Sequence, residues 1–184
     1  MENKILVTRS LILRFASVRV VSRRRVRLLG VIIGMIYSAN VLIWNSQKEV
    51  LVVSRKEDNN KYCLPGGKVD TTDYDDYYRT HYYKHFSMPE PGLAVLRRCA
   101  SRELKEECGV YIRPDDLQRV FMMEHKWKDE TYVCTTFWGK TSEEPRPGEP
   151  GTWTGWRRPD QLMQESNCPF SDLNVALFNY LGVR

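Results

Sequence analysis

The feature that most constrains how this chain folds is the stretch Leu93–Cys108, which has the pattern of a helix with one apolar and one acidic side. Apolar side chains recur on one stripe at helical spacing: Leu93, Leu96, Ala100, Leu104 and Cys108. Pro91 and Gly92 precede the stretch, and Gly109 stands where a glycine commonly ends a helix. We therefore expect a helix that packs on a core through one side and leaves the other side accessible.

The accessible side of this helix carries three glutamates. Glu103, Glu106 and Glu107 lie three and four positions apart, so their carboxylates converge on one patch. Such a cluster is repulsive by itself but suits a hard divalent cation, because Mg²⁺ prefers oxygen ligands and binds substrate phosphates beside a few carboxylates. Arg102 stands four residues before Glu106 and can pair with it. A solvated, charged helix face is the alternative interpretation, and it usually applies to Glu-Glu pairs.

The rest of the chain predicts strands on both sides of this helix. The expected elements are strands at 35–44, 49–54, 118–124, 131–139 and 153–156, a turn at 126–130 and a closing helix at 172–181. Pro65-Gly66-Gly67 is expected to form a tight turn whose glycines allow close backbone approach. The first two strands are expected to form a hairpin or to be neighbours. This order predicts an α/β fold with a mixed sheet covered on both faces.

Two motifs together carry a resemblance to a known family. The helix ends in Arg-Glu-Leu-Lys-Glu-Glu-Cys-Gly-Val, residues 102–110, and the upstream turn is Leu-Pro-Gly-Gly-Lys-Val, residues 64–69. They resemble the Nudix box, which is a Gly, five residues, a Glu, seven residues and then a string of the first type. The resemblance covers roughly residues 35–181. It implies a Nudix-like α/β/α sandwich for the domain 35–184 and a hydrolase acting on phosphoric anhydrides.

The spacing within the box departs from the family pattern. Gly67 lies 35 residues before Arg102 instead of fourteen, so 21 residues are inserted. Counted back from Arg102, the early Glu of the box falls on Ala94, so this acid is missing or displaced, with Glu90 as the candidate. The unusual segment, about 70–91, holds five tyrosines and two histidines, His81 and His85. Its aromatic side chains either pack on one another, stack on a base or close as a lid.

The resemblance also implies the metal site. Glu103, Glu106 and Glu107 would bind Mg²⁺, with Mn²⁺ as the alternative, and the Gly67 carbonyl would add a ligand. A bound metal lowers the pKa of a water molecule, orients a diphosphate and neutralises charge on phosphoryl oxygens. Arg102 would orient the glutamates.

A carboxylate must also take a proton from the attacking water. The resemblance places this base either in the box or in a later loop, which here is 142–149. Glu144 is preferred and Glu107 is its rival, while a solvated loop acid is an equally open interpretation of Glu144. Arg55, Lys68 and Gly66 are expected to contact the diphosphate, although both cations could also be ordinary surface charges.

The implied activity is Mg-dependent pyrophosphohydrolysis of a nucleoside diphosphate linked to another moiety. The first expectation is a (deoxy)nucleoside triphosphate that yields the monophosphate and pyrophosphate. Within the same class, capped RNA, a dinucleoside polyphosphate, ADP-ribose and a diphosphoinositol phosphate stay open. From another class, a non-catalytic nucleotide-binding Nudix module stays open, although the intact glutamate cluster argues against it.

The basic charge of the chain belongs to its N-terminal arm. Residues 1–34 hold eight Lys and Arg against one Glu, which leaves −2 for the rest of a chain whose net charge is +5. The arm is interpreted as a transit peptide, a packed element, a contact for RNA or anionic lipid, or an upstream segment with little role. We expect a cytoplasmic protein, or a mitochondrial one if the arm is a targeting segment. The sequence sets no oligomeric state.

Neither a membrane span nor a disulfide framework is expected. The uncharged stretch 28–44 contains Ser38 and Asn40, and its second half is needed as a core strand. The five cysteines are odd in number and contain no Cys-x-x-Cys pair, which favours reduced, buried thiols.

Overall fold

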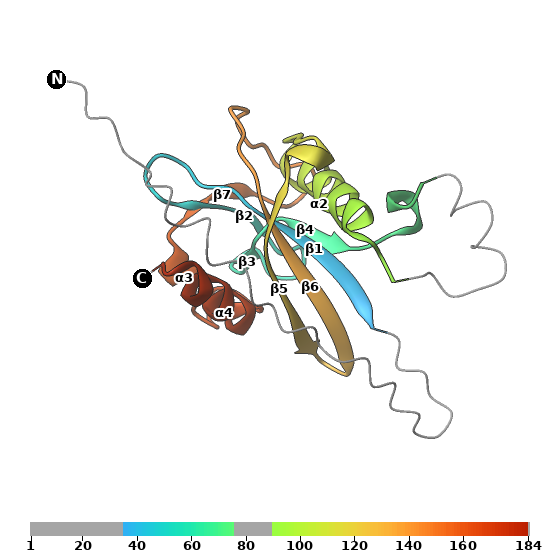
Figure 1. Ribbon diagram of the computed structural model, residues 1–184. Helices are drawn as coiled ribbons and strands as arrows, with labels where there is room; N and C mark the ends of the chain where they lie inside the picture. Colours follow the sequence, from blue (N-terminus) through green and yellow to red (C-terminus); the bar gives the residue numbers. More distant parts are fainter. Residues whose placement is uncertain (1–34, 76–89, 184) are drawn as a thin grey trace. The chain divides into compact units, whose positions relative to one another are not determined.

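The computed structural model describes residues 35–75 and 90–183 (Figure 1). The interpretations of the arm, of the inserted tyrosines from Tyr77 onward and of His81 and His85 fall outside these residues. Within them, no helix is long and apolar enough to cross a membrane.

The strands form two sheets. The strands are β1 Ile36–Leu42, β2 Val50–Ser54, β3 Tyr62–Cys63, β4 Gly66–Lys68, β5 Gln118–Trp127, β6 Glu130–Trp138 and β7 Thr154–Arg157. One sheet has the order β4-β1-β6-β5 and the other has the order β3-β2-β7. Strand β1 runs parallel to β6 and antiparallel to β4, so the first sheet is mixed, as the sequence predicted.

Helices cover both faces of these sheets. The helices are α2 Leu93–Cys108, α3 Pro159–Leu162 and α4 Ser171–Leu181, with short 3₁₀ turns at Thr71–Asp73 (η2) and Pro114–Asp116 (η3). Helix α2 lies on one side of the sheets, and α3 and α4 lie on the other (Figure 1). The predicted α/β/α sandwich is therefore confirmed.

The side chains of β2 alternate between the two faces of its sheet, and both faces are apolar. Leu51 and Val53 belong to the apolar cluster that includes the buried side of α2. Val50 and Val52, which point the opposite way, belong to the cluster that includes α3 and α4. Since all four side chains are at least 97% buried, the strand requires a helical layer on each side.

Helix α2 begins and ends at the predicted residues. Its C-terminal glycine, Gly109, has φ 65° and donates its N–H to the Lys105 carbonyl. This left-handed conformation has little steric penalty for glycine, so the local sequence sets the end of the helix.

Other predictions needed correction. The turn expected at 126–130 is shorter, because β5 continues to Trp127 and β6 begins at Glu130, with Lys128 at φ 55°. Residues Gly66–Lys68 form the short strand β4 beside β1 instead of a turn alone. Strands β1 and β2 meet at the Trp44–Val50 bridge but then enter different sheets, because each pairs further along with a distant strand.

Candidate active site

The acidic face of α2 closes against the glycine segment of β4. The backbone N–H of Gly66 donates to Glu107 Oε2 over 2.8 Å. At Gly67, a Cβ atom would collide with the Glu103 carboxyl group, so a residue larger than glycine would displace this glutamate. The structure thus brings together four residues that the sequence placed at the site.

Arg102 links two of the glutamates to an acid that lies far away in the sequence. Its Nε and Nη2 atoms donate to the two carboxylate oxygens of Asp73 over 2.9 and 3.0 Å. Its Nη1 atom contacts Glu103 Oε1 at 2.8 Å and Glu106 Oε2 at 2.9 Å. A guanidinium held at two points by one carboxylate has a fixed direction. Arg102 therefore orients Glu103 and Glu106, as the sequence suggested.

Asp73 is a site residue that the sequence analysis missed. Five residues separate it from Gly67, so Asp73 stands at the position of the early box acid when the box is counted forward from the glycine. Its side chain is 2% exposed and also accepts a hydrogen bond from the Asp70 N–H. Arg102 is thus paired with Asp73 and not with Glu90. The 21 inserted residues of the box therefore follow Asp73 instead of preceding it. Counting the box forward from Gly67, as well as backward from Arg102, would have identified Asp73.

Two of the glutamates are buried where an ionised carboxylate is poorly solvated. The pKa of Glu107 is raised from 4.5 to about 8, mainly by burial and also by Glu103 and Glu149, although the Gly66 N–H and Arg55 act in the opposite direction. Burial also raises the pKa of Glu103. A bound divalent cation would favour the ionised form of both carboxylates, and their oxygen atoms are the ligands that a hard cation prefers.

The glutamates do not form a closed metal cage as they stand. Within residues 35–75 and 90–183, no three acidic, histidine or cysteine side chains are gathered tightly enough to hold an ion. Glu103 and Glu106 share Arg102 Nη1, and Glu107 accepts from Gly66, so a cation would compete with these partners. The Gly67 carbonyl, the fourth expected ligand, lies 3.7 Å from Cys99 Sγ.

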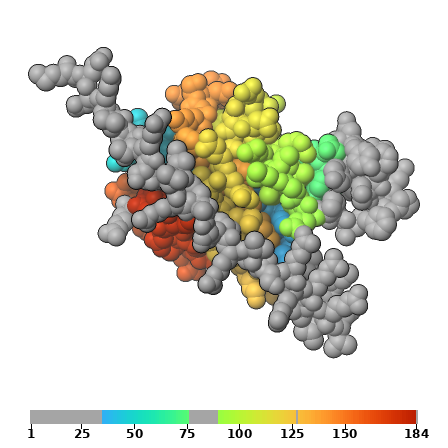
Figure 2. Space-filling model, viewed as in Figure 1, coloured from blue at the N-terminus to red at the C-terminus, as the bar shows by residue number. Residues whose placement is uncertain are grey.

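The loop between β6 and β7 caps the end of α2. The N–H groups of Arg146 and Gly148 donate to the carbonyls of Cys108 and Glu107 over 2.8 and 2.9 Å. Figure 2 shows this loop in orange against the yellow segment that contains the end of α2. Helix-terminal carbonyls need partners from outside the helix, and here the loop supplies them, which brings the loop close to the end of the acidic face.

Glu149 is the acid of this loop that lies near the glutamates. It lines a small cavity with Glu107 and forms an ion pair with Lys56 at 2.8 Å. Glu144, which the sequence analysis preferred, is exposed and does not line that cavity. Neither Glu149 nor Lys56 was singled out from the sequence, since the docking of the loop uses backbone groups that carry no side-chain pattern.

The geometry agrees with a comparison to known families. A sequence profile of the NUDIX domain matches residues 35–176. The chain belongs to the Nudix family. It is thus a hydrolase that acts on phosphoric anhydrides in nucleoside diphosphate-linked substrates, and dependence on a divalent metal, typically Mg²⁺, is general in this family.

Solved structures share the Nudix fold at low sequence identity. A MutT protein from Methanosarcina mazei is 18% identical with a TM-score of 0.57, over 82% of this chain and 97% of that one. A MutT NUDIX hydrolase from Burkholderia pseudomallei is 21% identical with a TM-score of 0.54, over 78% and 98%. An Ap4A hydrolase from C. elegans is 13% identical with a TM-score of 0.52, over 80% and 96%. A comparison with curated proteins found no match.

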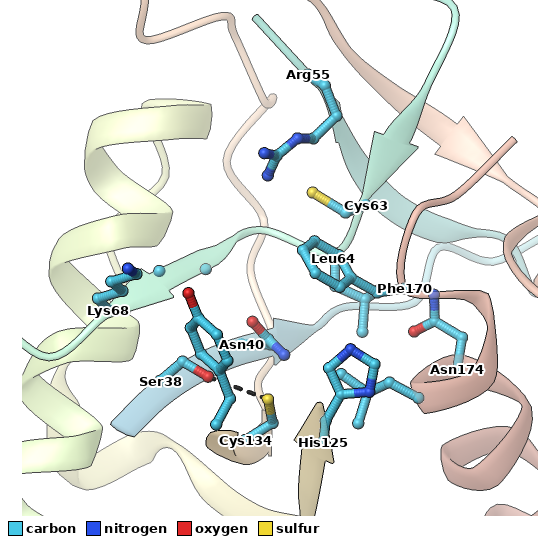
Figure 3. Close-up of a pocket in the computed structure, with 14 residues that line it drawn as sticks. Ser38, Asn40, Arg55, Cys63, Leu64, Lys68, His125, Cys134, Phe170 and Asn174 are labelled. Carbon is cyan, nitrogen blue, oxygen red and sulfur yellow. Dashed lines mark hydrogen bonds between the residues drawn. The ribbon is translucent and has the colours of Figure 1, made fainter. Parts of the chain in front are cut away.

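The two predicted cations of this Nudix domain line a common cavity of about 190 Å³, called the second cavity below (Figure 3). Arg55 also lines the small cavity of Glu107. Lys68 contacts Glu130 at 3.7 Å and lies over the Tyr132 ring. Gly66 lines the second cavity as well, so both cations and the glycine segment border the same space.

Proposed function

We propose that this Nudix hydrolase cleaves a nucleoside triphosphate to the monophosphate and pyrophosphate. The supporting observation is the position of the second cavity, which is bordered by Gly66 and Gly67, the two glycines that also lie against Glu107 and Glu103. A diphosphate lying along that segment would place its nucleoside in the cavity and its leaving phosphates beside the acidic face of α2. A volume of about 190 Å³ suits one aromatic ring system, since cavities of about 150 Å³ hold benzene.

The residues around the glutamates would then have distinct roles. Glu103, Glu106 and Glu107 would hold Mg²⁺, and Mn²⁺ would suit the same oxygen donors. When bound, the metal lowers the pKa of water and neutralises phosphoryl charge. Arg102 would keep Glu103 and Glu106 aligned, and the Gly66 N–H would hold Glu107 through its hydrogen bond to Oε2.

Two further groups complete this proposal. Arg55 lines both cavities and would bind the bridging phosphates, and Lys68, which lines the second cavity, would assist it. A carboxylate has to take the proton from the attacking water as the anhydride bond breaks. We assign this role to Glu149 instead of Glu144, because Glu149 lies beside Glu107 in the small cavity.

Two solved Nudix structures indicate which substrates the test must include. One is an Ap4A hydrolase, and another is the NUDIX domain of Shewanella oneidensis NrtR with ADP ribose, which is 14% identical with a TM-score of 0.55. At these identities the likeness shows the fold alone. The screen therefore compares nucleoside triphosphates, ADP-ribose, a dinucleoside tetraphosphate and capped RNA.

The decisive experiment measures phosphate and pyrophosphate release from each substrate with Mg²⁺, in the wild type and in Glu106→Gln. We expect nucleoside triphosphates to be cleaved fastest, with a loss of about 10³-fold in the variant, since metal stabilisation of the reacting phosphate contributes several kcal/mol. Preference for another substrate would replace the triphosphate assignment. Turnover that is equal in wild type and variant would overturn the glutamate mechanism.

The assignment of the base makes a separate prediction. Glu149→Gln should lower kcat by about 10²- to 10⁴-fold, the usual contribution of a general base. Glu144→Gln is the matched control, because it makes the same change in the same loop at an exposed position. Its kcat should stay within about twofold of the wild type. Equal losses in both variants would point to the loop as a whole, and a loss in Glu144→Gln alone would restore Glu144 as the base.

A further inference from the structure

The second cavity contains a buried polar atom that the proposed chemistry does not use. His125, near the end of β5, is 6% exposed, and its imidazole stands up into the cavity (Figure 3). Its Nε2 atom is buried and has no hydrogen-bond partner in the described part of the chain. Buried polar atoms almost always have partners, so an unpaired one at a cavity indicates that a ligand supplies the partner.

The other ring nitrogen of His125 is already engaged. Its Nδ1 atom lies 3.1 Å from Asp172 Oδ2, in the first turn of α4. An ionised carboxylate only accepts hydrogen bonds, so the contact requires a proton on Nδ1. In the neutral ring, Nε2 is then an acceptor. With the ring neutral, the occupant that satisfies Nε2 presents an N–H or O–H donor.

The walls of the cavity fit a flat heterocycle. Leu64, Leu173 and the Phe170 ring supply apolar surface, and Asn40 lies between the Arg55 and His125 ends (Figure 3). The Phe170 ring packs edge-on against His125, with the ring centroids 6.0 Å apart. The His125 ring is therefore held by the Asp172 carboxylate on one side and an aromatic contact on another, which fixes the direction of Nε2.

We propose that His125 is a specificity-determining residue that accepts a hydrogen bond from an N–H group on the edge of the substrate's base, with Asp172 as the positioning residue that sets its tautomer. This inference rests on the proposed function, because it takes the nucleoside of the substrate as the occupant of the cavity. It adds a selection rule: bases that present an N–H toward His125 are bound, and analogues that lack this one group are rejected.

The test uses binding, so that it does not depend on turnover. The probes are triphosphates with a methylene bridge between the α and β phosphorus atoms, in pairs that differ by one donor. The pairs are adenosine with purine riboside, guanosine with inosine, and uridine with 3-methyluridine. Their dissociation constants are measured calorimetrically with the full chain and Mg²⁺. In at least one pair, the analogue without the donor should bind about 10- to 100-fold more weakly.

Variants then assign this preference to His125. His125→Leu should weaken the binding of the preferred probe by about 10- to 100-fold. Both members of its pair should then bind with similar affinity. Asp172→Asn should reduce the preference in part, because an amide can also donate and no longer fixes the proton on Nδ1. Asp172 has an exposed side chain, so this variant stays informative if His125→Leu fails to fold. Glu124→Gln, an exposed neighbour on β5 outside the cavity, is the control and should keep the preference.

A spectroscopic readout separates base contact from a structural role. The ¹⁵N resonance of His125 Nε2 should move on binding the preferred probe and stay near its free position with the analogue that lacks the donor. The proposal is overturned if no pair is discriminated, or if His125→Leu and Asp172→Asn both keep the full preference. If the probe pairs are discriminated but no triphosphate is hydrolysed, the role of His125 in binding is retained and only the proposed function is contradicted.

Discussion

Replacement of Glu107 by Gln is expected to remove activity and at the same time stabilise the metal-free protein. The loss should be about 10³-fold or more, because metal stabilisation contributes several kcal/mol and about 1.4 kcal/mol corresponds to tenfold. The gain in stability follows from burial, which raises the pKa of the Glu107 carboxyl to about 8. Glutamine keeps an oxygen for the Gly66 N–H without the buried charge.

The sign of the pH effect follows from this raised pKa. Between pH 4.5 and about 8, the folded protein holds the Glu107 proton more tightly than the unfolded chain does. The free energy of unfolding should therefore fall as pH rises through this window in the metal-free wild type. Mg²⁺ should restore stability near pH 8, because a bound cation favours the ionised carboxylate.

The measurement is thermal unfolding at several pH values from 5 to 8, with and without Mg²⁺. The wild type should lose several degrees of melting temperature across this range without Mg²⁺, and Glu107→Gln should lose clearly less. Glu165→Gln, a change at an exposed glutamate, should follow the wild type. Parallel curves for wild type and Glu107→Gln would show that Glu107 is not the group that titrates.

Helix α2 could be predicted from sequence because its determinants are local. Apolar spacing predicted the buried side of α2 except at Leu93, which is 38% exposed. The same spacing placed Glu103, Glu106 and Glu107 on the other side. Gly109 marked the end of the helix through its left-handed conformation. These features depend on residues within a few positions of one another, so a single sequence contains them.

The partners of this helix depended on long-range contacts. Asp73 reaches Arg102 across 29 positions, and the extra residues between them misled a count made only backward from the arginine. Glu149 lies near Glu107 because backbone hydrogen bonds hold its loop against the end of α2, and any sequence can make such bonds. The role proposed for His125 depends on its contact with Asp172, which lies on α4. Sequence patterns alone contain no signal for such pairings, since they arise only when distant elements pack.

The pairing of Asp73 with Arg102 leads to the second large effect. Asp73→Asn should destabilise the protein by roughly 3 kcal/mol, because it leaves a partly buried guanidinium without its buried carboxylate. Arg102 would then bind more closely to Glu103 and Glu106, which it already contacts at 2.8 and 2.9 Å. These carboxylates would be less available to Mg²⁺, so kcat should fall by about 10- to 100-fold, the usual effect of losing a residue that orients metal ligands.

Three measurements distinguish this positioning role from a loss of folding. The Mg²⁺ concentration for half-maximal activity should rise in Asp73→Asn at a temperature where the variant is folded, and Asp73→Glu should recover part of kcat because it keeps the charge. Asp116→Asn is the matched control, since Asp116 makes the same kind of pair with Arg113 at 2.8 Å but at the surface. It should change stability by about 0.5 kcal/mol or less and leave kcat unaltered. A drop in stability with no change in the Mg²⁺ requirement would mean that Asp73 supports the fold without orienting the glutamates.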